Sequence, residues 1–513
     1  MIENPVLRGF NPDPSMIRVG QKYYIATSTF EWYGSIQIHA SCDLVNWRFV
    51  RRVLYEDFSG ICDGGGIWAP CLTYSDGTYY LVYTVVRERG AMMQTDNYLI
   101  TTHDIEGEWS KPAYLHSLGF DPSLFHDNDG KKWLLSLNNH HTSGKRFNGI
   151  WIWQYDAKNA ALVGEPRLLY SQKGNELVEG CHIYRHEDFY YLMKAQGGTG
   201  RRHSTQLSRS RTLLGEYEDC PFILLHSRDN NALALQCAGH SSLVETPCGE
   251  YYISHLATRR SCEHDFCYFG RETALQKVFW GNDGWLHLEN GGENPSLNTA
   301  SLFTCEDSIR PAFTRYDFKK GVLSSDFQSL RTDITSAVSF CQHGLILRGT
   351  QSLMSKFFQS LFARRIDTNF FSISVSLMFE PLWEKHMAGI VIYYNTNYWH
   401  YLCVTRLDDS KKKVVRIISC DAGTLSFPSC AEVREETPLL LKMTAEGCRL
   451  SCCVCDGEHE FCIGEPLSMH IVSEEYVPLG FTGAMAGFCC QDLSRQEKTA
   501  LFEYFEYATH GTR

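Results

Sequence analysis

Asp13-Pro-Ser-Met-Ile-Arg-Val-Gly-Gln-Lys-Tyr-Tyr-Ile25 is the first of five related segments in the chain. Each segment has a small or ionisable first residue, a short apolar run, a turn rich in Gly or Asp, and an aromatic residue or pair before a second apolar run. Two apolar runs around such a turn predict a β-hairpin. The other four segments are Ala69-Pro-Cys-Leu-Thr-Tyr-Ser-Asp-Gly-Thr-Tyr-Tyr-Leu81, Asp121-Pro-Ser-Leu-Phe-His-Asp-Asn-Asp-Gly-Lys-Lys-Trp-Leu134, Glu179-Gly-Cys-His-Ile-Tyr-Arg-His-Glu-Asp-Phe-Tyr-Tyr-Leu192 and His240-Ser-Ser-Leu-Val-Glu-Thr-Pro-Cys-Gly-Glu-Tyr-Tyr-Ile253.

The spacing of these segments indicates a repeat architecture. A four-stranded propeller blade with its loops needs about 40–50 residues or slightly more, and the five starting positions fit that length. No long amphipathic helical pattern separates the segments, which argues against a (β/α)₈ barrel. The sequence therefore predicts a five-bladed β-propeller over residues 1–310 of the 513-residue chain.

Ionisable residues stand at the first position of four of the five segments. The innermost strands of a propeller line its axis, so we expect the five first residues to converge there. Three carboxylates buried together are costly unless they have a function. Taken singly, Asp before Pro is common in turns and Glu is common on surfaces. The five residues are Asp13, Ala69, Asp121, Glu179 and His240.

Such carboxylates suit the hydrolysis of a glycosidic bond. An inverting enzyme needs a general acid for the leaving oxygen and a carboxylate that activates water on the other side of the sugar. A third carboxylate would raise the pKa of a neighbouring acid by like-charge repulsion. Spacing alone does not assign these roles.

Six motifs in chain order resemble the glycoside hydrolase family 43 β-xylosidases. The two segments of the last motif resemble the accessory domain of that branch, so the resemblance covers nearly the whole chain. One departure is Cys181, where the family usually has Pro. The motifs are Gly9-Phe-Asn-Pro-Asp-Pro-Ser15 with Ile25-Ala-Thr-Ser-Thr-Phe-Glu-Trp32, Trp68-Ala-Pro70, Gly119-Phe-Asp-Pro-Ser123, Val178-Glu-Gly180, Gly270-Arg-Glu-Thr-Ala-Leu-Gln-Lys277, and Gly480-Phe-Thr-Gly-Ala484 with Cys489-Cys-Gln-Asp-Leu493.

The resemblance implies roles for the catalytic residues. Asp13 matches the general base, Glu179 the general acid, and Asp121 the residue that orients the acid and tunes its pKa. Arg271 matches an arginine beside the base, where its charge would keep the base ionised and its donors could hold a sugar hydroxyl.

The resemblance also implies a substrate pocket. Trp68 and Phe30 match its aromatic walls, with Ala69 beside them, although either aromatic residue could instead belong to a blade core. His240 is expected to contact the sugar directly or through water. The alternative is a calcium-like divalent cation held through water in the channel; otherwise we expect no cofactor.

A second domain is predicted over residues 315–513. Phe371-Ser-Ile-Ser-Val-Ser-Leu-Met378 alternates with a period of two, and further strand-like runs follow without helices. This pattern predicts a β-sandwich of the concanavalin or lectin type. The resemblance implies that a loop of this domain closes one end of the pocket, with Phe481 or Met485 as the residue that arrives there, and that closure would favour exo action.

Composition excludes several functions. The net charge of −11 and the absence of a basic run disfavour nucleic-acid binding. The first residues lack the pattern of a signal peptide, and no run of about 18 apolar residues predicts a membrane span. The 21 cysteines are therefore expected to be reduced, mostly buried thiols in a cytoplasmic protein. The sequence leaves open whether the chain forms a homo-oligomer.

These observations together predict an exo-acting, inverting enzyme that releases xylose from the non-reducing end of β-1,4-xylo-oligosaccharides. An α-L-arabinofuranosidase, or an enzyme with both activities, is the first alternative. A non-catalytic glycan-binding propeller is a second alternative, which the three carboxylates disfavour.

Overall fold

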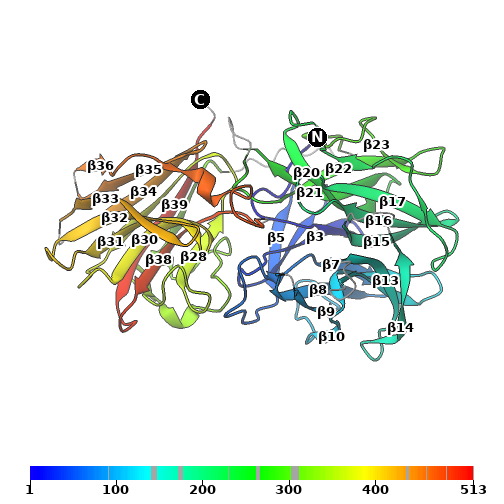
Figure 1. The fold of residues 1–513 in the computed structure, drawn as a ribbon, viewed down its shortest axis with the longest axis horizontal. Helices are drawn as coiled ribbons and strands as arrows, with labels where there is room; N and C mark the ends of the chain where they lie inside the picture. Colours follow the sequence, from blue (N-terminus) through cyan, green and yellow to red (C-terminus); the bar gives the residue numbers. More distant parts are fainter. Residues whose placement is uncertain are drawn as a thin grey trace.

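The computed structural model describes the chain except for residues 91, 140–146, 172–176, 229, 261–265, 302–310, 435–437, 458, 481 and 512–513. The described residues form β-strands and three short 3-10 helices, arranged in two adjacent bodies (Figure 1). One body is a propeller of five antiparallel sheets and the other a sandwich of two sheets. The predicted all-β architecture of propeller and sandwich is confirmed.

Each blade contains four or five strands in meander order. Blade one is β2 (Ser15–Val19), β3 (Lys22–Ser28), β4 (Ile36–Ser41) and β5 (Arg48–Val53). Blade two is β6 (Gly66–Ile67), β7 (Cys71–Ser75), β8 (Thr78–Glu88), β9 (Gln94–Thr102) and β10 (Ala113–His116). Blade three is β11 (Gly119–His126), β12 (Lys132–Asn139), β13 (Phe147–Asp156) and β14 (Ala161–Tyr170). Blade four is β15 (Val178–His186), β16 (Phe189–Gln196), β17 (Ser204–Ser210), β18 (Glu218–Asp219) and β19 (Leu225–His226), and blade five is β20 (Leu235–Glu245), β21 (Tyr251–Arg259), β22 (Glu272–Trp280) and β23 (Leu286–Leu288).

The first long strand of each blade faces the propeller axis, and the N-terminal segment lies along blade five. Strands β2, β7, β11, β15 and β20 contact one another around the axis. At the chain start, β1 (Ile2–Glu3) pairs with β24 (Asn298–Thr299). The Asn4 amide donates to the carbonyl of Leu275 in β22 at 2.7 Å. These contacts join the first residues to the end of the propeller and so close the ring.

The aromatic pair in the repeat packs the blades against each other. Successive side chains of a strand point to opposite faces, so two adjacent aromatic residues reach both neighbouring blades. Tyr24 joins the apolar core between blades one and two, which also contains Tyr79. Tyr23 points the other way and packs with Val244 and Tyr252 of blade five. The aromatic pairs therefore belong to the core and not to the sugar pocket.

A bulge at the start of the innermost strands changes the predicted alignment of the fourth repeat. Asp13, Asp121 and His240 have φ of 52–53°, the left-handed region, and in blade four that conformation falls on Gly180 with φ of 56°. Regular pairing resumes two residues later, at His182 in blade four. Glu179 therefore lies one residue before the repeat position that the sequence assigned to it. Gly is needed at 180 because an added Cβ would lie 2.6 Å from Nε2 of His240.

The sandwich has a nine-stranded and a six-stranded sheet. The larger sheet contains β26 (Val338–Cys341), β27 (Gly344–Arg348), β39 (Thr499–Thr509), β29 (Phe370–Met378), β34 (Leu439–Glu446), β35 (Arg449–Cys455) and β36 (Glu460–Cys462), with β25 (Phe313–Asp317) and β37 (Leu467–Ser468) beside this path. The smaller sheet contains β28 (Ser360–Arg365), β38 (Met485–Asp492), β30 (His386–Asn395), β31 (Tyr398–Arg406), β32 (Lys413–Asp421) and β33 (Thr424–Glu432). The 3-10 helices are η1 (Phe318–Lys320), η2 (Thr335–Ala337) and η3 (Met469–Val472). The predicted division near residues 310–315 falls between β24 and β25, beside residues outside the described part, and stays a prediction.

Apolar packing joins the two bodies. Phe266, Tyr268 and Phe269 of the propeller are buried in the same cluster as the sandwich core. Trp32 of blade one, 2% exposed, packs edge-on against Tyr393 of β30, with 6.1 Å between ring centroids. The domains therefore share a continuous apolar interface.

One expectation about cysteine is wrong in part. Cys453 and Cys462 face each other across β35 and β36 and form a disulfide. Other cysteines, including Cys181, Cys403 and Cys490, are buried free thiols as expected. Within the described part of the chain, no helix has the length and apolar character that a membrane span requires.

Candidate active site

A cavity of about 330 Å³ lies at the end of the propeller axis where the bulges bring the predicted residues together. Larger hollows lie at the opposite end of the axis, between the propeller and the sandwich, and on the sandwich itself. The cavity at the propeller axis is distinguished from these hollows by its three carboxylates and not by its volume. Its lining is Asp13, Phe30, Trp68, Ala69, Met93, Phe120, Asp121, Phe147, Leu177, Glu179, Gly198, Thr199, His240, Arg271, Leu479 and Gly480.

Asp13 is held as a carboxylate between Arg271 and His240. Nη1 of Arg271 donates to Oδ1 of Asp13 at 2.6 Å, and Nδ1 of His240 lies 3.4 Å from the same oxygen. Burial alone would raise the pKa of Asp13, but the charges of Arg271 and His240 outweigh it and lower the pKa. The reverse holds for His240, where burial alone would lower the pKa and the bond to Asp13 raises it. At neutral pH Asp13 is therefore an ionised base.

The pKa values of Glu179 and Asp121 are raised, whereas that of Asp13 is lowered. Burial, followed by the negative charge of Asp121, raises the pKa of Glu179 to about 8. Burial, followed by the charge of Asp13, raises the pKa of Asp121 to about 6. Oδ2 of Asp121 accepts a hydrogen bond from the backbone N–H of Gly180 at 3.1 Å, which fixes the peptide next to Glu179. Glu179 is therefore a protonated acid at neutral pH.

The cavity thus combines an ionised carboxylate and a protonated carboxylic acid. Two titratable groups whose environments separate their pKa values are suited to the roles of base and acid. Glycoside hydrolysis needs this combination, because the leaving oxygen must be protonated while the opposite side of the sugar is attacked. The geometry allows that chemistry.

Aromatic rings form the walls of the cavity. The ring centroids of Phe30 and Trp68 are 6.1 Å apart, and those of Trp68 and Phe120 are 5.3 Å apart. The guanidinium carbon of Arg271 lies 5.3 Å from the centroid of Phe30. Ala69, at the innermost position of blade two, lines the cavity beside Trp68. Apolar ring faces of this kind suit the apolar faces of a sugar.

The structure adds wall residues that the repeat did not reveal. Phe120 directly precedes Asp121, and this position next to a predicted catalytic residue could have identified it as a wall residue from the sequence. Phe147, Leu177 and Thr199 belong to other strands and loops of blades three and four, where no repeat position marks them.

The sandwich also contributes to the cavity. Leu479 and Gly480 line it, and Nη1 of Arg89 in the propeller donates to the carbonyl of Leu479 at 3.0 Å. The prediction for Phe481 lies outside the described residues. The alternative, Met485, is wrong, because this residue is buried in β38 in an apolar cluster with Trp32 and Tyr393. A period-two strand places its alternate residues in the core, so Met485 cannot turn toward the pocket.

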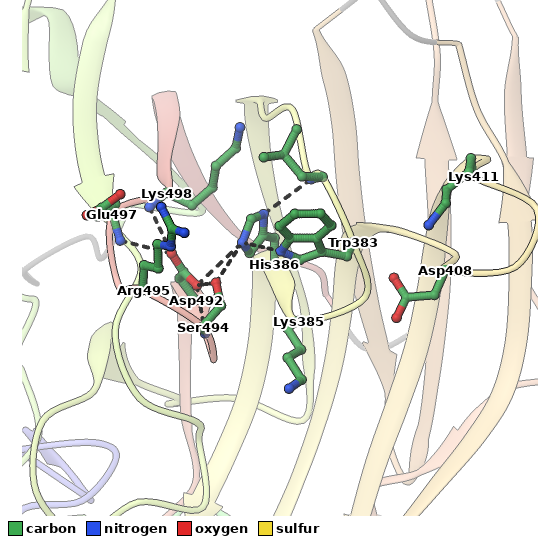
Figure 2. Close-up of a pocket in the computed structure, with 11 residues that line it drawn as sticks. Trp383, Lys385, His386, Asp408, Lys411, Asp492, Ser494, Arg495, Glu497 and Lys498 are labelled. Carbon is green, nitrogen blue, oxygen red and sulfur yellow. Dashed lines mark hydrogen bonds and ion pairs between the residues drawn. The ribbon is translucent and has the colours of Figure 1, made fainter.

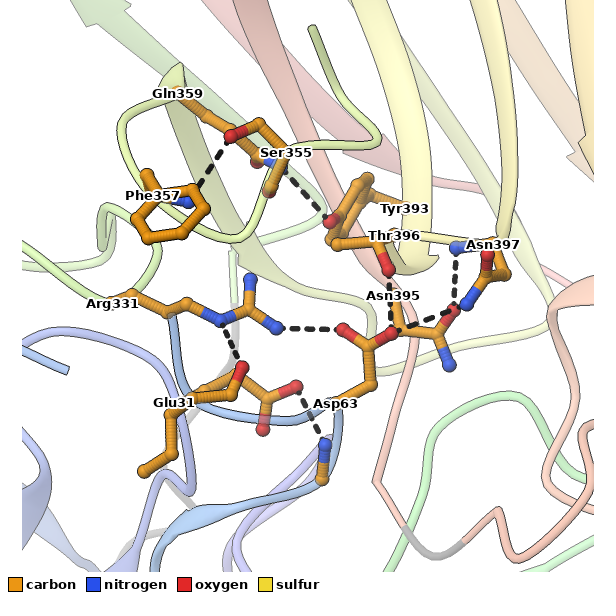
Figure 3. Close-up of polar contacts among 12 residues, drawn as sticks. Glu31, Asp63, Arg331, Ser355, Phe357, Gln359, Tyr393, Asn395, Thr396 and Asn397 are labelled. Atoms are coloured by element: carbon orange, nitrogen blue, oxygen red, sulfur yellow. Dashed lines mark hydrogen bonds and ion pairs between the residues drawn. The ribbon is translucent and has the colours of Figure 1, made fainter. Parts of the chain in front are cut away.

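A buried polar network connects the sandwich to the aromatic wall (Figure 3). Nη2 of Arg331 donates to Oδ1 of Asp63 at 2.6 Å, and the Arg331 side chain is 1% exposed. Oδ2 of Asp63 accepts hydrogen bonds from Thr396 and Asn397 in the turn after β30. The network therefore ties a propeller loop to the sandwich.

The same network reaches Trp68 through Glu31. The backbone N–H of Arg331 donates to the carbonyl of Glu31 at 2.7 Å. Oε1 of Glu31 accepts from the backbone N–H of Gly64, and the Gly64 carbonyl accepts from the indole N–H of Trp68, both at 3.0 Å. Glu31 directly follows Phe30. The two aromatic walls are thus positioned by groups whose partners come from the sandwich side.

Known proteins share this architecture along the whole chain. Residues 2–286 match the model for glycosyl hydrolases family 43, and residues 315–508 match the beta xylosidase C-terminal concanavalin A-like domain. The chain belongs to glycosyl hydrolases family 43. It is 40% identical to the xylosidase/arabinosidase 43B of Humicola insolens (99% of this chain, 97% of the relative) and 38% identical to the beta-xylosidase of Bacillus subtilis (99% of each). The crystal structure of a xylan beta-1,4-xylosidase from Bacillus halodurans superimposes with a TM-score of 0.95 at 40% identity, covering 99% of this chain and 100% of that one.

Proposed function

We propose that this family 43 enzyme is an exo-acting β-xylosidase that releases xylose from the non-reducing end of β-1,4-xylo-oligosaccharides with inversion of configuration. The observation that carries the proposal is the pairing of ionised Asp13 with protonated Glu179 in one aromatic-walled cavity. The names of the Bacillus relatives support the substrate.

In the proposed reaction, the carboxylate of Asp13 takes a proton from a water molecule, whose oxygen attacks the anomeric carbon. Glu179 donates its proton to the glycosidic oxygen as that bond breaks, so the leaving sugar departs as a neutral alcohol. Asp121 keeps Glu179 protonated and holds Gly180. The guanidinium of Arg271 and the ring of His240 keep Asp13 ionised, and the sugar is held against Trp68 and Phe30.

Arabinofuranosidase activity in the same cavity is the second candidate, because the Humicola relative is named for both activities. Chromogenic β-xyloside and α-L-arabinofuranoside should be compared under the same conditions. A higher kcat/KM for the xyloside supports the proposal, and a higher value for the arabinoside contradicts it. Proton NMR of the first-formed xylose should show the α-anomer, and a β-anomer would overturn the inverting mechanism.

We further propose that the reaction needs no cofactor and that the enzyme acts in the cytoplasm. Among the described residues, no three His, Cys, Asp or Glu side chains are arranged to hold a metal ion directly, so a calcium-like cation near His240 would have to be held through water. Equal activity with EDTA and with added Ca²⁺ is the expected result.

A further inference from the structure

A hollow of about 770 Å³ on the sandwich, which we refer to as the sandwich hollow, has no role in the proposed reaction. Three loops line it, with residues 382–386, 408–411 and 492–498 (Figure 2). They lie at one end of the neighbouring strands β38, β30 and β31. The opposite end of β30 carries the turn that contacts Asp63, about 30 Å away at 3.3 Å per residue. The sandwich hollow is therefore separate from the active site.

An exposed tryptophan ring is fixed in the middle of the sandwich hollow (Figure 2). Trp383 is 45% exposed, although its indole N–H donates to Nε2 of His386 at 3.0 Å. Burial lowers the pKa of His386, and its ring centroid lies 5.7 Å from that of Trp383, a contact that also holds the indole in place. A fixed, half-exposed aromatic ring loses little conformational entropy when a ligand stacks on it.

The charges around Trp383 favour an anionic group. Four cationic side chains, Lys385, Lys411, Arg495 and Lys498, line the sandwich hollow, and none of them forms an ion pair with another described residue. A group of four cationic side chains without ion pairs in the described part of the chain is unusual in a protein with a net charge of −11.

Two of the three acidic residues in the sandwich hollow have other partners. Asp492 is 1% exposed, and its carboxylate accepts from the backbone N–H groups of Ser494, Glu497 and Lys498. Oδ1 of Asp408 accepts from the N–H of Glu384 at 3.1 Å. Asp408 and Asp492 hold the loops in place, and the third acid, Glu497, is exposed beside the four cationic side chains, which outnumber it.

We infer that the sandwich hollow is a second glycan-binding site, whose ligand is an oligosaccharide that carries a carboxylate, such as a xylan fragment substituted with a uronic acid. One sugar face would stack on Trp383, and the carboxylate would bind among the four cations by charge-assisted hydrogen bonds. The inference extends the proposed function, because hydrolysis of a small aryl xyloside needs no such site. Its ligand class nevertheless rests on the proposed xylan-type substrate.

Affinity electrophoresis tests the inference with the full chain in an Asp13→Asn background, which stops turnover. Glucuronoxylan should retard the protein about tenfold more strongly than unsubstituted xylan, equivalent to about 1.4 kcal/mol. Added salt should remove the difference. Equal retardation by the two polymers, or none, would overturn the inference.

Matched variants locate the binding. Trp383→Ala should abolish the retardation, whereas Phe427→Ala, at another exposed aromatic residue of the sandwich, should not change it. Lys411→Gln should weaken retardation by glucuronoxylan, and Lys412→Gln should not, because Lys412 pairs with Glu432 at 2.6 Å. The opposite pattern for either pair contradicts the site.

Hydrolysis of an aryl xyloside separates this inference from the proposed function. Trp383→Ala with Asp13 intact should hydrolyse the aryl xyloside at the wild-type rate. If the wild-type enzyme lacks that activity, the proposed function fails even if glucuronoxylan binds. If Trp383→Ala is unstable, the Lys411 and Lys412 variants decide the question.

Discussion

Nη1 of Arg271 lies 2.6 Å from Oδ1 of Asp13, and the two residues are 2% and 4% exposed. They come from opposite ends of the propeller sequence, 258 positions apart. The closure of the ring between blades five and one brings them together. This ion pair keeps a buried carboxylate ionised, so it links the closure of the fold to the proposed base.

Replacing Arg271 should move the acidic limb of the pH profile. In Arg271→Met, the pKa of Asp13 rises because the positive charge that lowers it is gone. The acidic limb of kcat/KM should shift to higher pH, and kcat/KM at the optimum should fall about 10²–10³-fold. Arg271→Lys keeps the charge and should restore the position of the limb. An unshifted limb in Arg271→Met would show that another group sets it.

Replacing Asp121 should move the alkaline limb in the opposite direction. The acid must be protonated, so activity is lost as pH rises through the pKa of Glu179, about 8. Asp121→Asn removes a negative charge that raises this pKa while keeping a polar group near Gly180. The alkaline limb of kcat/KM should therefore shift to lower pH. A lower kcat with an unchanged limb would indicate a purely structural role for Asp121.

Glu179→Ala should discriminate between leaving groups. A poor leaving group needs a proton, so hydrolysis of xylobiose should fall by about 10²–10⁴-fold. An activated aryl xyloside leaves as a stable anion and should keep far more of its rate. Steady-state kinetics on both substrates measure the difference, and equal losses would exclude Glu179 as the acid.

Arg331→Lys should weaken substrate binding more than turnover. Lys keeps the charge but lacks the planar guanidinium, whose Nη2 donates to Asp63 while its Nε donates to the carbonyl of Ile61. We expect KM for xylobiose to rise about three- to tenfold because the aromatic wall shifts, with kcat nearly unchanged.

The control for Arg331 is Arg315→Lys, at an exposed ion pair with Glu506. It should leave both constants unchanged. A variant that only destabilised the protein would lower the active fraction and thus kcat, together with the melting temperature. A fall in kcat without a rise in KM would therefore contradict the positioning role of Arg331.

The sequence by itself determined the architecture and most of the site. Aromatic pairs such as Tyr23 and Tyr24 recur at blade spacing because each blade buries both faces against its neighbours. The ionisable residues recur with them because innermost strands meet at the axis. Asp13, Asp121, Glu179 and His240 could therefore be placed in one cavity without coordinates.

The tertiary structure alone decided where the chain departs from that regularity. Whether Glu179 or Gly180 occupies the repeat position depends on the contact with His240, a residue of another blade. The approach of Leu479 to the cavity depends on its bond with Arg89, and the burial of Met485 on the packing of Trp32 and Tyr393. Each of these depends on contacts between residues far apart in the chain, and a local pattern of polarity and turns does not encode such contacts.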